Sequence, residues 1–309
     1  MSRWLAVCGL VFVGCGSSDE GSAAPAGDTG VDAAPSDSVA DVPTTSGLRT
    51  LDNCTTNIAA DAQEFYKRYF RCVTITTTDS SVVIASQGLP PHQSNYWDKT
   101  DPNWEPFDTS RGASYRENPN KLKAQTLKLT IPKAPTAKSI TITSSYVDGV
   151  VGTNGHEYSL GPVGVALDSV AMFNPLAGPG DDIENEKYTF DRYNAHPEMM
   201  GAYHYHTATP GPLEVLKKIG AVTNTTPGSA ELELYGIMCD GTAVLGCKEL
   251  DGSAPAGALD AQGGHTHDLT DKAGVKLLEG RYHTHVCPST TGMRRFTPEI
   301  QYYTTCQKG

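Results

Sequence analysis

One set of motifs is repeated within the chain, and this internal echo constrains the fold more than any other sequence feature. Three motifs occur twice in the same order: an apolar segment that begins with Gly and ends with Asp, the motif Asp-x4-His, and the motif Gly-x-Tyr-His-x-His. The first copy has these parts at 164–168, 191–196 and 201–206, and the second has them at 236–240, 260–265 and 280–285. One match can arise by chance, whereas three in one order predict a duplicated unit. We expect the duplication to span about 161–210 and 231–290.

Each Tyr-His-x-His phrase predicts a strand with two different faces. Because side chains alternate along a strand, His204 and His206 point one way, and Tyr203 and Tyr205 point the other. Imidazole is the commonest metal ligand, so the histidine face predicts a metal site. The tyrosine rings are expected to pack against the core and to form hydrogen bonds through their hydroxyls. The alternative is a surface strand whose histidines bind nothing.

The distribution of the histidines favours metal binding. All nine lie between residues 92 and 285, and most fall within the echoed units. The candidate ligands are His92, His196, His204, His206, His265, His267, His283 and His285, with His156 a weaker candidate. Asp191 and Asp260 are expected to hold an imidazole in one tautomer, with capping of a turn as the alternative. We expect the two units to face each other across one shared histidine-lined cavity.

Histidine ligands without a Cys-x-x-Cys motif favour copper or zinc as the metal cofactor. Two function classes follow: a metal-binding protein, and a metal-dependent hydrolase or oxidase with an open coordination position. A third alternative is a carbohydrate- or cell-surface-binding module in which the histidines are structural. In that case Trp97 and Trp104 would be binding platforms, although core packing is the more ordinary use of both rings.

The N-terminus is typical of an exported protein. Residues 1–15 combine Arg3 with an apolar run that is too short to span a bilayer, which indicates a signal peptide. Cys15 stands at the expected cleavage point and is predicted to carry lipid, as in bacterial lipoproteins. Gly16 follows it and favours sorting to the outer membrane or cell surface of a Gram-negative bacterium. The alternative is an ordinary secreted protein.

Residues 16–50 contain no aromatic residue and are rich in Gly, Ser, Ala, Thr, Pro and Asp, so we expect a disordered acidic tether before a folded domain at 51–309.

The chain has 24 Lys and Arg against 35 Asp and Glu, which argues against nucleic acid as a partner. Membrane contact is therefore expected only through lipid on Cys15, and the metal ion is the one predicted partner.

Six of the eight cysteines lie in the predicted domain, and in an exported chain they indicate disulfides. The sequence-local pairing is Cys54–Cys72, Cys239–Cys247 and Cys287–Cys306.

Alternating polar and apolar residues predict a mainly β fold. Residues 70–88 predict a hairpin, residues 125–132 and 138–147 predict half-buried strands, and residues 161–175 and 231–246 predict strand–turn–strand units. Short helices are expected within 59–70 and 211–221. We therefore expect a single domain of sandwich-like sheets with long loops and few short helices.

These motifs resemble the YHYH-domain family of exported bacterial proteins. Tyr203-His204-Tyr205-His206 matches the motif that gives the family its name, and segments 89–92, 161–168 and 194–197 resemble further family landmarks. The resemblance covers about residues 70–290. The second copy departs from the motif at Thr284, whereas its Gly-His segment at 263–267 is closer to the family than 194–197. The resemblance implies membership of this family and no particular activity.

Overall fold

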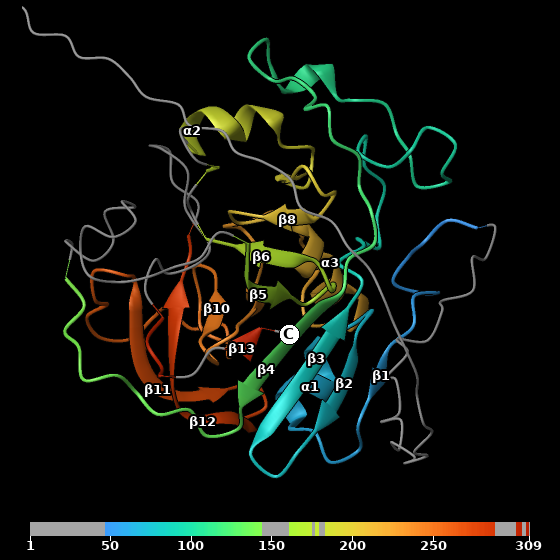
Figure 1. Cartoon of the computed structure of the whole chain (residues 1–309). Helices are drawn as coiled ribbons and strands as arrows, with labels where there is room; N and C mark the ends of the chain where they lie inside the picture. Colours follow the sequence, from blue (N-terminus) through green and yellow to red (C-terminus); the bar gives the residue numbers. More distant parts are fainter. Residues whose placement is uncertain are drawn as a thin grey trace, which may run out of the picture. The chain divides into compact units, whose positions relative to one another are not determined.

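Two β-sheets carry most of the regular structure (Figure 1). The computed structural model describes residues 47–143, 161–174, 177–178, 183–287, 301–304 and 307–308. These residues belong to one compact unit, Thr44–Gly309, and the other unit, Met1–Pro43, lies outside the described residues. The predicted signal peptide and Cys15 are therefore not described.

The first sheet joins the N-terminal part of the domain to a short strand near the C-terminus. In spatial order it contains β1 (Asn57–Ile58), β2 (Thr74–Thr77), β3 (Ser81–Ser86), β4 (Leu127–Pro132) and β13 (Gln307–Lys308). β2 and β3 are the antiparallel hairpin predicted for residues 70–88, and β4 is the strand predicted for residues 125–132. Alternation buries Val82 and Ile84 on β3, opposite Ile131 and Leu129 on β4.

The second sheet contains both echoed units. Its spatial order is β11 (Gly264–Thr270), β12 (Lys276–His285), β10 (Ala243–Leu245), β9 (Leu234–Met238), β5 (Pro162–Ala166), β6 (Ala171–Phe173), β8 (Tyr203–Tyr205) and β7 (Ala195–Pro197). β5–β6 and β9–β10 are the two predicted strand–turn–strand units.

The strand order reveals a pseudo-two-fold axis at the centre of this sheet. β5, β6, β8 and β7 follow one another outward on one side, and their counterparts β9, β10, β12 and β11 follow in the same order on the other. The registers match as well, because Ala171 is opposite His204 and Ala243 is opposite His283, both in parallel pairs. The predicted duplication is therefore visible in the fold.

Glycine is required where the two repeats meet. A Cβ on Gly164 would lie 2.7 Å from the backbone oxygen of Ile237, and a Cβ on Gly236 would lie 2.2 Å from that of Val165. The equivalent glycines of the echo therefore allow β5 and β9 to approach each other.

One hydrophobic core holds the two sheets together. Val82 and Leu129 of the first sheet and Val165 and Ile237 of the second belong to the same cluster of buried residues. This arrangement confirms the expected sandwich-like single domain, and burial of these side chains is the main stabilising contribution.

Few helices are present among the described residues, and all are short. They are α1 (Glu64–Tyr69), α2 (Ile183–Glu186), α3 (Pro210–Lys218) and the 3-10 helices η1 (Thr109–Arg111) and η3 (Lys187–Thr189). The two helices predicted within 59–70 and 211–221 are α1 and α3. Thr209 caps α3, because its hydroxyl accepts a hydrogen bond from the backbone nitrogen of Gly211. None of these helices has the length and apolar character needed to cross a bilayer.

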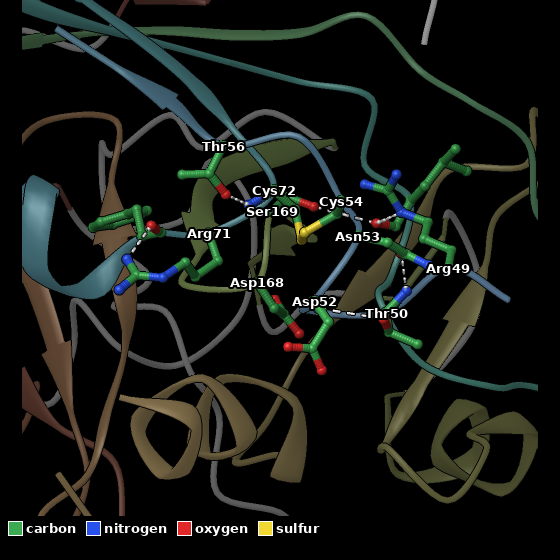
Figure 2. Close-up of a disulfide and its surroundings, with 12 residues drawn as sticks. Arg49, Thr50, Asp52, Asn53, Cys54, Thr56, Arg71, Cys72, Asp168 and Ser169 are labelled. Atoms are coloured by element: carbon green, nitrogen blue, oxygen red, sulfur yellow. Dashed lines mark hydrogen bonds between the residues drawn. A yellow bond between two sulfur atoms is a disulfide. The ribbon is translucent and has the colours of Figure 1, made fainter. Parts of the chain in front are cut away.

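The disulfides confirm one predicted pairing and correct the others. Cys54 is bonded to Cys72, and the backbone nitrogen of Cys72 donates to the Thr56 hydroxyl at 2.8 Å (Figure 2). Cys247 is bonded to Cys287, so the predictions for Cys239–Cys247 and Cys287–Cys306 are wrong.

The sheet register explains the correct partner. Leu245 is opposite His285 in the parallel β10–β12 pair, and this places Cys247 and Cys287 across from each other with Cα atoms 4.7 Å apart. Cys239 is also disulfide-bonded, and Cys306 lies outside the described residues.

Two boundary predictions also change. No strand forms at 138–143. An isolated bridge joins Ala137, just before this segment, to Tyr303, and residues 144–147 lie outside the described residues. Residues 47–50, which were assigned to the predicted tether, are described with the folded domain, and the backbone nitrogen of Arg49 donates to the Asn103 side chain at 2.7 Å.

Candidate metal centres

Three histidines of the first repeat converge at the outer end of the second sheet. His196 lies on β7 opposite His204 on β8, and His206 follows that strand directly. Nε2 of His204 lies 3.2 Å from Nε2 of His196 and 2.8 Å from Nε2 of His206. All three side chains are buried. We call this group the first centre.

Hydrogen bonds fix the tautomer of each of these imidazoles. Nδ1 of His204 donates to the backbone oxygen of Ala202 at 2.8 Å, and Nδ1 of His206 donates to that of Asn174 at 2.7 Å. Because a carbonyl can only accept, each Nδ1 carries the proton and each Nε2 has a free lone pair.

His196 has the same tautomer for a different reason. Its Nδ1 lies 2.6 Å from the hydroxyl of Thr189, and that hydroxyl already donates its proton to the backbone oxygen of Glu186 at 2.8 Å. The hydroxyl must therefore accept from Nδ1, which leaves Nε2 of His196 unprotonated as well.

Three unprotonated nitrogens thus face one another in a buried space. Burial lowers the pKa of His196, His204 and His206 well below the usual 6.5, and the neighbouring imidazoles lower it further. Neutral lone pairs at these distances repel one another unless a cation lies between them. Nitrogen ligands of a tetrahedral zinc ion, each about 2.0–2.1 Å from the metal, are separated by roughly 3.3 Å. The group therefore fits a transition metal ion.

The tyrosines occupy the opposite face, as the alternation predicts. Tyr203 and Tyr205 are buried in the core, where the Tyr203 hydroxyl donates to Asp191 at 2.6 Å and the Tyr205 hydroxyl donates to Asp168 at 2.7 Å. The motif therefore combines one ligand face with one packing face.

Asp191 and Asp260 do not touch an imidazole, so their predicted role as second-shell acceptors is wrong. Asp191 accepts hydrogen bonds from the backbone nitrogens of Tyr193 and Ala195. Asp260 accepts them from Gln262 and Gly264 in the same way. Each carboxylate also accepts from the tyrosine of its own repeat. They cap turns and anchor tyrosines, which is the alternative stated above.

The structure does not bring His92 to the first centre. Its Nε2 lies 3.3 Å from the Tyr205 hydroxyl, and its ring stacks on Tyr193 with centroids 3.4 Å apart. It therefore packs on the tyrosine face, where burial lowers its pKa to about 3. Its predicted role as a metal ligand is wrong, and His156 lies outside the described residues.

A second histidine group lies at the other end of the same sheet. His265 and His267 on β11 and His283 and His285 on β12 surround the carboxylate of Glu249. Nε2 of His265 lies 3.0 Å from Glu249 Oε1, and Nε2 of His283 lies 3.3 Å from Oε2. We call these five residues the second centre.

The same tautomer recurs throughout the second centre. The Nδ1 atoms of its four imidazoles donate to backbone oxygens at 2.8–3.1 Å, from His265 to Ala256, His267 to Asp268, His283 to Arg281 and His285 to Gly246. Every Nε2 therefore presents a lone pair to the carboxylate. Lone pairs facing a carboxylate need a cation or a shared proton between them.

Two buried atoms in this centre have no hydrogen-bond partner, namely Glu249 Oε2 and His283 Nε2. Burial raises the pKa of Glu249, whereas hydrogen bonds and positive charge from His283 and His285, which require a proton on Nε2, lower that pKa well below its usual range. Burial and the neighbouring His283 lower the pKa of His265. A carboxylate surrounded by four imidazoles is a donor set suited to a divalent cation.

The two centres are equivalent by the pseudo-two-fold axis. His196 is opposite His204 as His265 is opposite His283, and the Nδ1 partner is in each case the residue two before His204 or His283. They nevertheless lie at opposite ends of the sheet order and form separate groups. The expectation of one shared cavity is therefore wrong.

Sequence reasoning missed three polar residues that lie at these centres. Glu249 stands in the loop after β10, and Glu186 of α2 has Oε1 3.7 Å from Nε2 of His196. Thr189 orients His196. None of them repeats between the copies, so the echo contained no signal for them.

Each centre borders a cavity. The first centre lines a cavity of about 950 Å³ whose wall also includes Leu127, Phe173 and the exposed Met199 and Met200. The second lines one of about 520 Å³. Trp97 is buried, and its indole nitrogen donates to the backbone oxygen of His92. Trp104 is partly buried against the core. These contacts support the core-packing alternative for both rings.

The comparisons place these motifs in a known family. No curated protein matches the chain, and no solved structure matches it. The family model described as YHYH protein matches residues 128–282, which is about half of the chain. The match includes the whole first centre and His265, His267 and Glu249 of the second, and it ends just before His283. The chain is therefore a member of the YHYH protein family.

Proposed function

We propose that this chain is an exported, lipid-anchored protein that binds transition metal ions, copper or zinc, at two separate histidine centres. The observation that carries the proposal is the common tautomer of the seven imidazoles, each of which donates through Nδ1 and directs Nε2 into its group. In both groups the unprotonated Nε2 atoms are held in fixed directions by the Nδ1 hydrogen bonds, as the ligand atoms of metal-binding histidines are.

The two donor sets favour different ions. The first centre offers three neutral imidazoles, which suit copper and zinc. The second adds Glu249 and hence one negative charge, which also suits harder divalent ions. Because protons compete for every Nε2, both centres should release their ions in acid.

Metal content per chain tests the proposal. Protein purified from an oxidising compartment is stripped with chelator, loaded with zinc or copper, and analysed by mass spectrometry of the metal. We expect two ions per chain in the wild type, one for each group. His204→Ala/His206→Ala and His265→Ala/His283→Ala should each retain one.

His92→Ala is the matched control, because it removes a buried imidazole outside both centres. It should retain two ions. A wild-type content below one ion, or two ions in either double variant, would refute the proposal. Circular dichroism of each variant shows whether a lost ion reflects a lost fold.

Export and anchoring rest on the N-terminal sequence and on the disulfides, which persist in oxidising compartments. We expect mass spectrometry of the membrane fraction to find acyl groups on Cys15. Replacement of Cys15 by Ser should release the domain from the membrane. An unprocessed N-terminus in the mature protein would contradict the lipoprotein assignment.

A further inference from the structure

The two equivalent centres differ in how far a carboxylate closes them. In the second centre, Glu249 lies within 4.8 Å of the donor atoms of His265, His267 and His283 and belongs to the same group. In the first centre, Glu186 lies 3.7 Å from His196 but does not belong to the group of three histidines. Glu186 therefore stands off from the position where an ion would lie.

The two centres also differ in the number of donor atoms that they offer to an ion. The second group has four donors, and His285 lies beside it with Nε2 3.3 Å from Glu249 Oε1. These donors fill the shell of a four- or five-coordinate ion. Among the residues that the structure describes, the first group has three, which leaves at least one position of a four-coordinate ion without a ligand from them, as in catalytic rather than structural sites.

The cavity beside the first centre has the size and lining of a small-molecule pocket. Its volume of about 950 Å³ lies at the upper end of the usual range of about 300–1,000 Å³. Apolar side chains from several elements line it, among them Leu127, Leu129, Pro162, Phe173 and Pro197. Phe173 stacks on His204 with centroids 3.8 Å apart, so an apolar surface continues up to the ligand itself.

Two of the side chains that line this cavity are both apolar and exposed. Met199 and Met200 are 85% and 73% exposed, the highest values among the large hydrophobic side chains described as exposed. They stand in the turn between β7 and β8, in which Glu198 accepts hydrogen bonds from the nitrogens of Met200 and Ala202. That turn therefore holds two exposed apolar side chains against the cavity.

We propose that the first centre keeps an open coordination position that takes up a small organic ligand with an apolar body and one donor oxygen or nitrogen, whereas Glu249 closes the second centre. This inference rests on the proposed metal binding. The apolar body lies in the cavity, and the donor atom completes the coordination of the ion. Of the two repeats, the first is then the reactive one and the second holds its ion in a closed shell.

Copper-loaded variants that keep one centre each provide the test. His265→Ala/His283→Ala keeps the first centre, and His204→Ala/His206→Ala keeps the second. Copper content is measured first, and a variant without copper refutes the proposed metal binding itself. Azide is then titrated while the visible spectrum is recorded. We expect a saturable new charge-transfer band for the first centre and none for the second.

Two further substitutions sharpen the comparison. Glu249→Ala in the variant that keeps the second centre should open a position there and produce the azide band. Glu186→Gln in the variant that keeps the first centre should leave the band in place, because Glu186 does not close that centre. Equal azide binding by both centres, or by neither, with copper present would overturn the proposal.

The apolar part of the ligand is tested with 4-nitrophenolate as the probe. It should displace azide from the first centre, and Met199→Glu/Met200→Glu should weaken its binding several-fold while azide binding is unchanged. Val275→Glu is the control, since Val275 is also exposed but does not line this cavity. Azide binding without displacement by the phenolate would overturn the organic-ligand class.

Discussion

Val165 and Ile237 lie directly opposite each other in the second sheet and occupy the same position in their two repeats. The pairs on either side of them exchange equivalent residues, because Gly164 faces Met238 and Ala166 faces Gly236. The pseudo-two-fold axis therefore passes between these two side chains. Each histidine centre lies at the outer end of its own repeat, so duplication produced two separate centres.

The face formed by Tyr203 and Tyr205 should contribute more to stability than to metal binding. Tyr205 is fully buried, and Tyr205→Ala deletes a large ring, which we expect to lower the free energy of unfolding by about 3–5 kcal/mol. Tyr205→Phe keeps the ring and removes the hydroxyl, with its hydrogen bond to Asp168 and its contact with His92, at about 1–3 kcal/mol. Denaturant titration of the metal-free proteins measures both. Wild-type stability in Tyr205→Ala would contradict the packing role.

The Cys247–Cys287 disulfide should support the second centre locally. Cys247 follows Gly246, which accepts from His285, and Cys287 is two residues beyond His285. Replacing both cysteines by Ser should lower the unfolding free energy by about 4 kcal/mol, as expected for a loop of this length, and should weaken metal binding at the second centre only.

The matched control for that experiment is Cys54→Ser/Cys72→Ser. It removes a shorter cross-link with a sequence separation of 18. Its expected cost is about 3 kcal/mol, and both centres should bind metal as in the wild type. Competition with a chromophoric chelator measures the affinities. Equal losses of affinity at both centres in the two variants would show that the effect is global.

Asp168 predicts a pH dependence with a definite sign. Burial raises the pKa of Asp168 to about 7, although the hydrogen bond from Tyr205 lowers it. In the unfolded chain the pKa is near 3.8. Between about pH 4 and 7 the folded protein holds a proton that the unfolded chain has released, so stability falls as pH rises. Relative to Asp168→Asn, the wild type should lose on the order of a few kcal/mol across this window. A constant difference across the window would contradict this.

The histidines of the first centre should give the metal-free protein a pH dependence of stability with the opposite sign. The pKa values of His196, His204 and His206 are lowered in the fold, so below about pH 6.5 the unfolded chain takes up protons that the folded chain refuses. This contribution is present above pH 6.5 and is lost as pH falls. Denaturant titrations at pH 7.5 and 5.0 should show a smaller decrease for a variant with Gln at all three positions. An equal decrease would place the titrating groups elsewhere.

Much of this fold was predictable because local signals agreed with it. Alternation predicted the hairpin β2–β3, the strand β4 and both faces of the Tyr203–His206 motif, since one side of each strand packs on the core. Repetition of three motifs in one order predicted the duplication. These signals depend on periodicity along the chain, which a sequence displays directly.

The remaining features depend on how distant segments pair. Cys247 meets Cys287 only because β10 and β12 are parallel neighbours, and nothing near either cysteine indicates this. Glu249 reaches four imidazoles from a loop, and His92 turns to the tyrosine face instead of the ligand face. The expectation of one shared centre failed because the axis runs through the middle of the sheet and places the histidines at its two ends.

The most direct measurement of the central claim is an anomalous difference map of crystals loaded with zinc or copper, recorded at the absorption edge of that metal. The account predicts two peaks per chain. One should lie among the Nε2 atoms of His196, His204 and His206, and the other should lie beside Glu249 among the Nε2 atoms of His265, His267 and His283. A single peak between the two repeats, or the absence of a peak at the first centre, would contradict it.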